Sequence, residues 1–263
     1  MEKNNKIISI KYIPERHKIG AIMRTDDNLD RIDLLEKAIK QLLQIKKISL
    51  IHVMIYHPNE NGIWQKLIKL FGKERKRVQF ERIYTGNFYN DLLNFAKEEQ
   101  IRRGIDYSIF ISPEAYPYAT EKNINKMIES AKDGACAIGI NIEEYSDLIK
   151  LGYLSNAFCM YKNTLINFVN IWDINASVKN KDTGKLDFGA EEVYLTKYLI
   201  DTFGKNRVSV INPDEGYLVE PKDKESQKKR NLVKKTKMER FKKMCKFLRI
   251  NIDYLQKNID WRK

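Results

Sequence analysis

The sequence is poor in cysteine, and the cysteines that it has are widely separated. Cys136, Cys159 and Cys245 are three in number, and no Cys-x-x-Cys pair occurs. An odd number of distant cysteines supports neither a disulfide framework nor a zinc knuckle. We therefore expect reduced, mostly buried thiols, as in a cytoplasmic protein.

Long hydrophobic runs are also missing. The longest, residues 48–56, contains Ser49 and His52 and has the length of a strand, whereas a membrane-spanning helix needs roughly 18 apolar residues. The polar residues 1–5 do not match the apolar core of a signal peptide. These absences favour a cytoplasmic chain that binds a membrane, if at all, peripherally at its inner face.

Three common active-site motifs are absent as well. The sequence contains no Gly-x-x-x-x-Gly-Lys-Ser/Thr, no Gly-x-Gly-x-x-Gly after a strand, and no Gly-x-Ser-x-Gly. The first two motifs bind phosphates through glycine-rich turns, and the third exposes a nucleophilic serine. P-loop nucleotidases, Rossmann dehydrogenases and α/β-hydrolases are therefore disfavoured.

The positive charge, by contrast, is abundant and unevenly distributed. The chain has a net charge of +13; residues 222–263 contain 16 Lys+Arg against 5 Asp+Glu, and residues 1–221 contain 32 against 30. We therefore predict one domain over residues 1–221 and a basic helical tail over 222–263. A basic appendage on a nearly neutral body is typical of docking to an anionic surface, such as a membrane.

Hydrophobic patterning predicts an α/β fold. Buried strands are expected near residues 18–24, 48–57, 106–112, 135–140, 156–162 and 208–211, and helical spacing covers 29–46, 87–103, 120–133 and 190–202. Repeated alternation of strands and helices favours a mostly parallel central sheet flanked by helices. In such sheets, ligands bind beyond the carboxyl ends of the strands.

The order of these elements, together with two segments, resembles the GT-A fold of nucleotide-sugar glycosyltransferases, in particular the inverting family 2. Residues 106–131 (DYSIFISPEAYPYATEKNINKMIESA) are similar to the central strand, metal-motif loop and helix of that family. Residues 188–195 (FGAEEVYL) are similar to its acidic pair at the start of a helix. The resemblance covers roughly residues 18–215 and implies a Rossmann-like three-layer fold and sugar transfer.

The acidic pair is the catalytic candidate that this resemblance implies. Glu191 or Glu192 would be the general base that deprotonates the acceptor hydroxyl, with Glu191 slightly preferred. A carboxylate at a helix N-terminus stays ionised because the helix dipole stabilises it. The plainer interpretation, in which both acids only complement that dipole, remains open.

The resemblance also implies a donor site and its ligands. The donor would be a nucleotide sugar, with a UDP-sugar favoured, and the acceptor a glycan or a lipid-linked glycan. Asp26 could accept a hydrogen bond from ribose or uracil, and Arg24 could contact phosphate; alternatively, Asp26 or Asp27 only caps the next helix. The implied donor-binding residues are Arg24, Thr25, Asp26, Ser112 and Tyr116.

The metal motif of the family is Asp-x-Asp, because two carboxylates reach one divalent ion beside the leaving diphosphate. This chain contains no Asp-x-Asp, and Ser112, Pro113 and Glu114 stand at the matching position. One carboxylate, Glu114, is left for Mn or Mg, so use of a divalent cation stays open. The runner-up function is therefore a non-catalytic protein on the same fold that binds a nucleotide sugar or a glycan.

The tail contains an apolar stripe at helical spacing. Its members are Phe241, Met244, Cys245, Leu248, Ile252 and Leu255, and the other face carries Lys242, Lys243, Lys246 and Arg249. This pattern predicts either a helix in the interface of an anionic membrane or a helix that packs its stripe onto the domain. A nucleic-acid-associated module is a third alternative, disfavoured because the tail has no RGG or stacking-aromatic pattern.

Overall fold

The computed structural model describes most of the chain. The described residues are 17–26, 29–56, 62–83, 90–166, 177–179, 181, 184, 186, 187, 191–220 and 224–262. The side chains of Asp26 and Glu191 lie outside them.

The core of the molecule is an eight-stranded sheet with the order β10-β9-β5-β6-β4-β1-β2-β3. All neighbouring strands are parallel except β6, which is antiparallel to both β4 and β5. The strands are β1 Ile19–Asp26, β2 Ile48–Tyr56, β3 Val78–Ile83, β4 Tyr107–Ile111, β5 Ala137–Ile140, β6 Phe158–Lys162, β9 Val208–Ile211 and β10 Ile259–Arg262, with a separate pair β7 Val178–Lys179 and β8 Leu186–Asp187.

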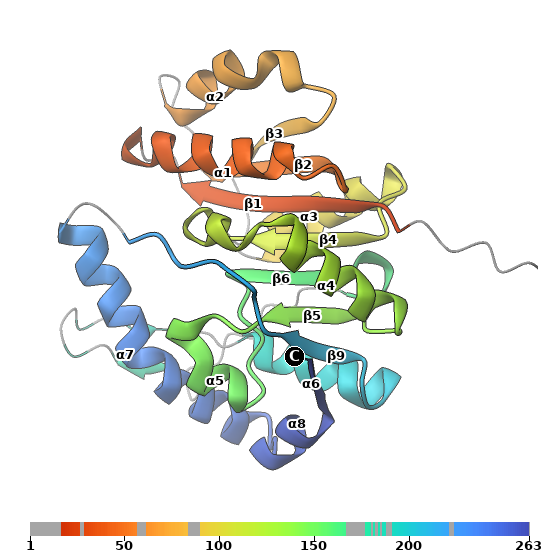
Figure 1. Ribbon diagram of the computed structural model, residues 1–263. Helices are drawn as coiled ribbons and strands as arrows, with labels where there is room; N and C mark the ends of the chain where they lie inside the picture. The colour runs from red at the N-terminus through yellow and green to blue at the C-terminus, as the bar shows by residue number, and fades with distance from the viewer. Residues whose placement is uncertain are drawn as a thin grey trace, which may run out of the picture.

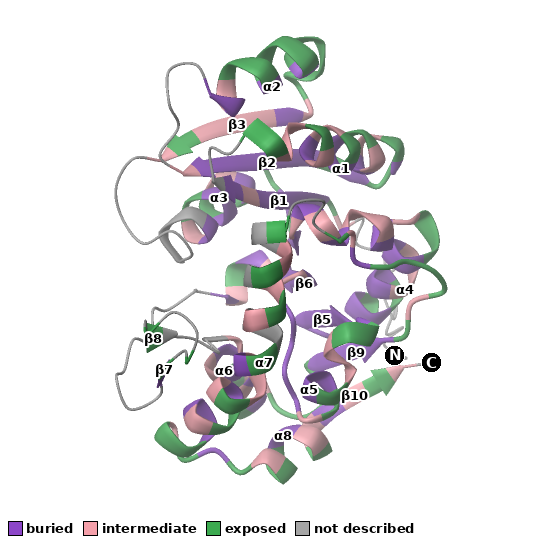
Figure 2. Ribbon diagram, turned by 90° about the vertical axis from the view of Figure 1, so that its left-hand side faces the viewer, coloured by how far each residue is buried: buried purple, intermediate pink, exposed green. Residues whose placement is uncertain are grey.

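Helices cover both faces of the sheet and give three layers (Figure 1). In the view turned by 90°, α1 and α4 lie on one side of the sheet, and α3 and α6 lie on the other (Figure 2). The helices are α1 Ile32–Gln44, α2 Ile63–Phe71, α3 Asn90–Arg102, α4 Glu121–Lys132, α5 Ser146–Lys150, α6 Glu191–Phe203, α7 Lys224–Phe247 and α8 Ile252–Asn258. This arrangement confirms the predicted mostly parallel, helix-flanked α/β fold.

Strands β4, β5 and β9 are buried over their whole length because both of their faces are covered. Every residue of β4, β5 and β9 is buried, as expected for parallel strands between two helical layers. Where β1 passes α3, Gly20 leaves room for the buried Gln100 amide, which donates to the Ala21 carbonyl over 3.0 Å. A Cβ at Gly20 would lie 2.2 Å from Gln100 Oε1, so a larger residue here would displace the Gln100 amide from its place against β1.

The C-terminal helices are present, but their apolar stripe is not free to enter a membrane. Phe241, Met244, Cys245 and Leu255 are all buried in the main core, and β10 pairs in parallel with β9 at the edge of the sheet. The alternative in which the stripe packs onto the domain is therefore confirmed, and the membrane-interface interpretation of the stripe is wrong. No helix in the described part of the chain is long and apolar enough to cross a membrane.

Candidate functional site

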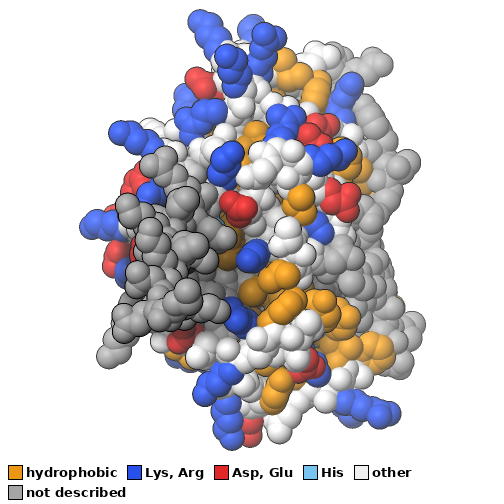
Figure 3. Space-filling model, turned by 90° about the vertical axis from the view of Figure 1, so that its right-hand side faces the viewer, with side chains coloured by type: hydrophobic (Ala, Val, Ile, Leu, Met, Phe, Trp, Pro, Cys, Tyr) orange, Lys and Arg blue, Asp and Glu red, His pale blue; other side chains and the backbone are white. Residues whose placement is uncertain are grey.

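The carboxyl ends of the parallel strands meet at one edge of the sheet, and four connecting segments begin there. These are η1 Leu29–Arg31 after β1, η3 Pro113–Tyr118 after β4, η4 Glu143–Tyr145 after β5, and residues 212–220 after β9. Helix α7 lies across this edge (Figures 1 and 2). On the opposite face, the coloured acidic side chains are scattered rather than gathered (Figure 3). The candidate site is therefore the carboxyl edge.

Glu114 and Arg31 join the first two of these segments. Nη2 of Arg31 lies 2.5 Å from Oε1 of Glu114, and the two side chains are 27% and 30% exposed. Arg31 is the residue that caps α1, and it makes no side-chain cap hydrogen bond. The 3-10 turn η1 runs directly into α1, and the alternative in which Asp26 or Asp27 caps the helix concerns side chains outside the described residues.

This ion pair bears directly on the question of a metal. The Glu114 carboxylate is bound to a guanidinium, and a divalent cation on it would stand beside that positive charge. Among the described residues, no group of three or more His, Cys, Asp or Glu side chains could hold a metal ion. Among the residues that the structure describes, Glu114 would therefore be the carboxylate to hold Mn or Mg, and it would have to leave Arg31 to do so.

Glu192 occupies the first turn of α6 and is held by a tyrosine. The Tyr153 hydroxyl donates to Glu192 Oε1 over 2.8 Å, and Tyr153, which precedes β6, is 1% exposed. The Thr196 hydroxyl donates to the Glu192 carbonyl over 2.7 Å. A carboxylate that is fixed on one oxygen by a buried phenol is oriented, which is what a general base requires. Glu191 precedes it in the helix, with its side chain outside the described residues.

The pKa of Tyr145 responds to several carboxylates at this edge. Burial raises the pKa of the Tyr145 phenol, and the adjacent Glu144 carboxylate raises it further. Glu114 and Glu192 both add smaller increases to the same pKa. Because one phenol senses both carboxylates, the end of β4 and the start of α6 belong to one electrostatic neighbourhood.

Helix α7 contributes two cations to this neighbourhood. Lys237 Nζ lies 4.2 Å from the Tyr145 ring centroid and 4.7 Å from that of Tyr153, distances at which a cation is attracted to an aromatic face. Arg230 donates to the Val219 carbonyl over 2.8 Å and lies 2.5 Å from Glu144 Oε1. Part of the tail's charge therefore faces the candidate site rather than a membrane.

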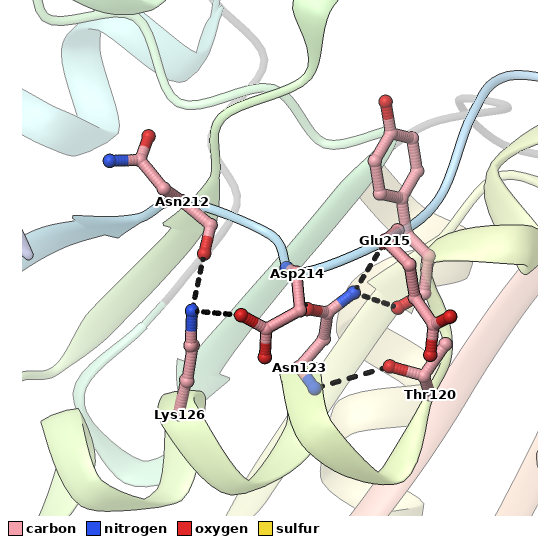
Figure 4. Close-up of polar contacts among 7 residues, drawn as sticks. Thr120, Asn123, Lys126, Asn212, Asp214 and Glu215 are labelled. Carbon is pink, nitrogen blue, oxygen red and sulfur yellow. Dashed lines mark hydrogen bonds and ion pairs between the residues drawn. The ribbon is translucent and has the colours of Figure 1, made fainter. Parts of the chain in front are cut away.

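The segment between β9 and α7 is fixed by helix α4 (Figure 4). The buried Asn123 amide donates to the carbonyls of Tyr118 and Glu215 over 2.9 Å each and accepts from the Asp214 amide over 3.0 Å. Lys126 adds an ion pair of 2.7 Å with Asp214. Further along, the Val219 amide donates to the Glu114 carbonyl over 2.8 Å. These bonds set the position from which α7 starts.

The predicted donor-binding residues take different places. Thr25 is buried in β1 and Arg24 is half-buried, whereas Ser112 and Tyr116 flank Glu114 and are half-buried at the edge. The Ser112 amide donates to the Ala157 carbonyl over 2.8 Å, which ties η3 to the start of β6. Ser112, Glu114 and Tyr116 therefore lie together, and Thr25 is largely covered by protein.

Of the predicted membrane-contact residues, Lys242, Lys246 and Arg249 are exposed. Lys243 is half-buried and donates to the Ser177 carbonyl over 2.9 Å. Lys243 thus helps to dock α7, and the other three remain available to an anionic surface.

The sequence did not indicate a role in the site for Arg31, Tyr145, Tyr153, Arg230 or Lys237. None of them belongs to a motif, and their partners are distant in the chain; Arg31 and Glu114, for example, are 83 positions apart. The available signal was positional, since Arg31 and Tyr145 follow strands whose carboxyl ends define the site.

Comparison with known proteins finds the fold among solved structures. No protein-family model matches the sequence, and no curated protein matches it. The chain is similar to the mannosyltransferase PcManGT from Pyrobaculum calidifontis, solved with GDP-Man and Mn²⁺, with a TM-score of 0.51 and 12% identity over 79% of this chain and 58% of that one.

A second similar structure is glucosyl-3-phosphoglycerate synthase from Mycobacterium tuberculosis, solved with Mn²⁺, UDP-glucose and phosphoglyceric acid. Its TM-score is 0.48, with 10% identity over 86% of this chain and 80% of that one. At these identities the likeness to the mannosyltransferase concerns the fold, and it confirms the GT-A-type architecture that the sequence predicted.

Proposed function

We propose that this chain is a glycosyltransferase that moves a sugar from a nucleotide sugar, a UDP-sugar being favoured, to a glycan or lipid-linked acceptor. The observation that carries the proposal is the Tyr153–Glu192 contact beside Tyr145, which also senses Glu114. An oriented carboxylate at the carboxyl edge of a GT-A-type sheet supplies the base that transfer to a hydroxyl requires.

In the proposed reaction, Glu192 accepts the proton of the acceptor hydroxyl on Oε2 while Tyr153 holds Oε1. The acceptor oxygen attacks the anomeric carbon, and the bond to the nucleoside diphosphate breaks with its electron pair on the phosphate oxygen. Attack from the face opposite to the leaving group inverts the anomeric centre. Glu191 remains the alternative base, because it lies one residue earlier in the same helical turn.

The base is tested with Glu192→Gln, Glu191→Gln and Tyr153→Phe, following the release of nucleoside diphosphate from UDP-, GDP- and CDP-sugars. We expect Glu192→Gln to lower turnover by about 10²–10⁴-fold and to leave nucleotide binding within about twofold. Tyr153→Phe keeps the ring but removes the orienting hydroxyl, so it should give a smaller loss.

Two results would change the assignment. If Glu192→Gln turned over at the rate of the wild type and Glu191→Gln lost its turnover, the general base would be Glu191. Nucleotide binding by the wild type without any turnover would favour the non-catalytic alternative. That alternative is itself favoured by one observation, the engagement of Glu114 with Arg31.

We also propose that the protein attaches peripherally to an anionic membrane surface at the cytoplasmic face. The contact would be made by the exposed Lys242, Lys246 and Arg249 rather than by the apolar stripe, which is buried. Basic residues near anionic headgroups contribute about 1 kcal/mol each. Such attachment would bring the enzyme close to lipid-linked acceptors.

A further inference from the structure

A leaving diphosphate needs positive charge beside it, since charge develops on its oxygens as the glycosidic bond breaks. The two chemical solutions are a divalent cation held by carboxylates and a guanidinium or ammonium group of the protein. For the first solution, the described residues offer no cluster of three or more acidic, His or Cys side chains, and the Glu114 carboxylate is already bound to a guanidinium. A guanidinium or ammonium group that serves this purpose should lie at the carboxyl ends of the central strands β1 and β4.

Arg31 stands at that place. β1 and β4 are adjacent and parallel, so η1 and η3, which follow them, meet beyond their carboxyl ends. Glu114 binds Nη2 of Arg31 at 2.5 Å and thereby fixes the guanidinium at this edge. A guanidinium is planar, stays protonated, and presents a fork of N–H donors that matches phosphate oxygens in pairs.

The neighbourhood favours an anion at this point. Arg31 stands at the N-cap position of α1 and its own side chain makes no cap hydrogen bond, so the positive end of the helix dipole lies next to the guanidinium. Lys237 adds positive charge at the ring faces of Tyr145 and Tyr153. A divalent cation on Glu114 would instead have to displace Arg31 or lie beside its charge.

From these contacts we propose that Arg31 takes the role of a metal ion: it binds the diphosphate of the donor, and Glu114 positions it. Nucleotide binding is then independent of divalent cations. This inference rests on the proposed function, because it assigns the cation that meets the leaving group of that reaction. It also gives a reason for the single carboxylate where the sequence has no Asp-x-Asp, since one carboxylate suffices to hold an arginine.

The test is calorimetric titration of the full chain with UDP, GDP and CDP, once with EDTA and once with Mn²⁺. We expect at least one nucleotide to bind with Kd values that agree within about threefold in the two buffers. Arg31→Ala should weaken binding by at least tenfold, about 1.4 kcal/mol, and Arg31→Lys should weaken it less because it keeps the charge.

Glu114→Gln separates the two roles of this carboxylate. If Glu114 positions an arginine, the variant loses the same part of its nucleotide affinity in EDTA and in Mn²⁺, because the guanidinium is no longer held at this edge. If Glu114 holds a metal, the variant loses affinity only in Mn²⁺. Thermal unfolding of each variant establishes that it is folded.

The failures of the two proposals are distinguishable. Binding that requires Mn²⁺ and is lost in Glu114→Gln would overturn the role of Arg31 and leave the proposed function standing. Binding in EDTA that is unchanged in Arg31→Ala would also overturn it. Absence of nucleotide binding in both buffers would overturn this inference and the proposed function together.

Discussion

The pKa of His52 is set by the protein that surrounds its side chain. It lies in β2 with 1% of its surface exposed, and burial, followed by the charge of Arg103, lowers its pKa from 6.5 to about 4. The folded protein therefore holds a neutral imidazole at pH values where the unfolded chain binds a proton. The stability that this residue contributes is complete above the unfolded pKa of 6.5 and is lost as the pH falls toward 4.

We predict a specific loss of stability in mild acid. Between pH 7 and pH 5, the titration of His52 should lower the free energy of unfolding by about 2 kcal/mol. Urea denaturation of the wild type and of His52→Leu at both pH values measures this loss, because the other titrating groups cancel in the comparison. Equal pH dependence of the two proteins would show that the buried imidazole is not the cause.

Residues of the site were predictable only where a motif carried them. Glu114 and Glu192 stand in segments that resemble family motifs, and the structure gives each a defined partner, Arg31 and Tyr153. Those partners were not predictable, because the pairing of an arginine before α1 with a loop 83 positions later is set by strand order. The order β4-β1 is a property of the sheet that no local pattern encodes.

At the scale of secondary-structure elements, hydrophobic patterning predicted the strands that are buried on both faces. β2, β4, β5 and β9 are short apolar runs, and each lies where the pattern placed it. β10 was not predicted, because Ile259–Arg262 is a run of only 4 residues that directly follows helix α8, too short for its alternation to stand out. The antiparallel direction of β6 could not be predicted either, because the hydrophobic pattern of a strand is the same in both chain directions.

The division at residues 221 and 222 can be tested by truncation. Phe241, Met244, Cys245 and Leu255 are buried in the main core, and burying such side chains contributes about 1.5–3 kcal/mol each. We therefore predict that residues 1–221 alone lose several kcal/mol of stability and expose apolar surface. Denaturant unfolding and binding of a hydrophobic dye measure this, and an unchanged unfolding midpoint would establish residues 1–221 as an independent domain.

A matched control separates packing from charge in the same element. The substitutions Lys242→Gln, Lys246→Gln and Arg249→Gln remove three exposed cations without touching the buried stripe. Surface changes of this kind usually alter stability by less than about 0.5 kcal/mol. The triple variant should therefore unfold like the wild type.

At the scale of the whole molecule, the net charge of +13 predicts attraction to anionic surfaces. Cosedimentation with vesicles that contain phosphatidylserine should exceed that with phosphatidylcholine alone and should fall as salt is added. The triple variant should bind at least tenfold more weakly, given about 1 kcal/mol for each lost cation. Equal binding of variant and wild type would place the contact elsewhere on the surface.

The position of β10 has a consequence for biosynthesis. β10 pairs with β9, yet 47 residues separate Ile211 from Ile259 in the sequence. At about 5–20 residues per second, the ribosome needs roughly 2–9 s to make that interval. Throughout it, the outer backbone groups of β9 form an open sheet edge that can pair with another chain. The nascent protein thus passes through a period of several seconds in which chaperone protection of this edge would matter most.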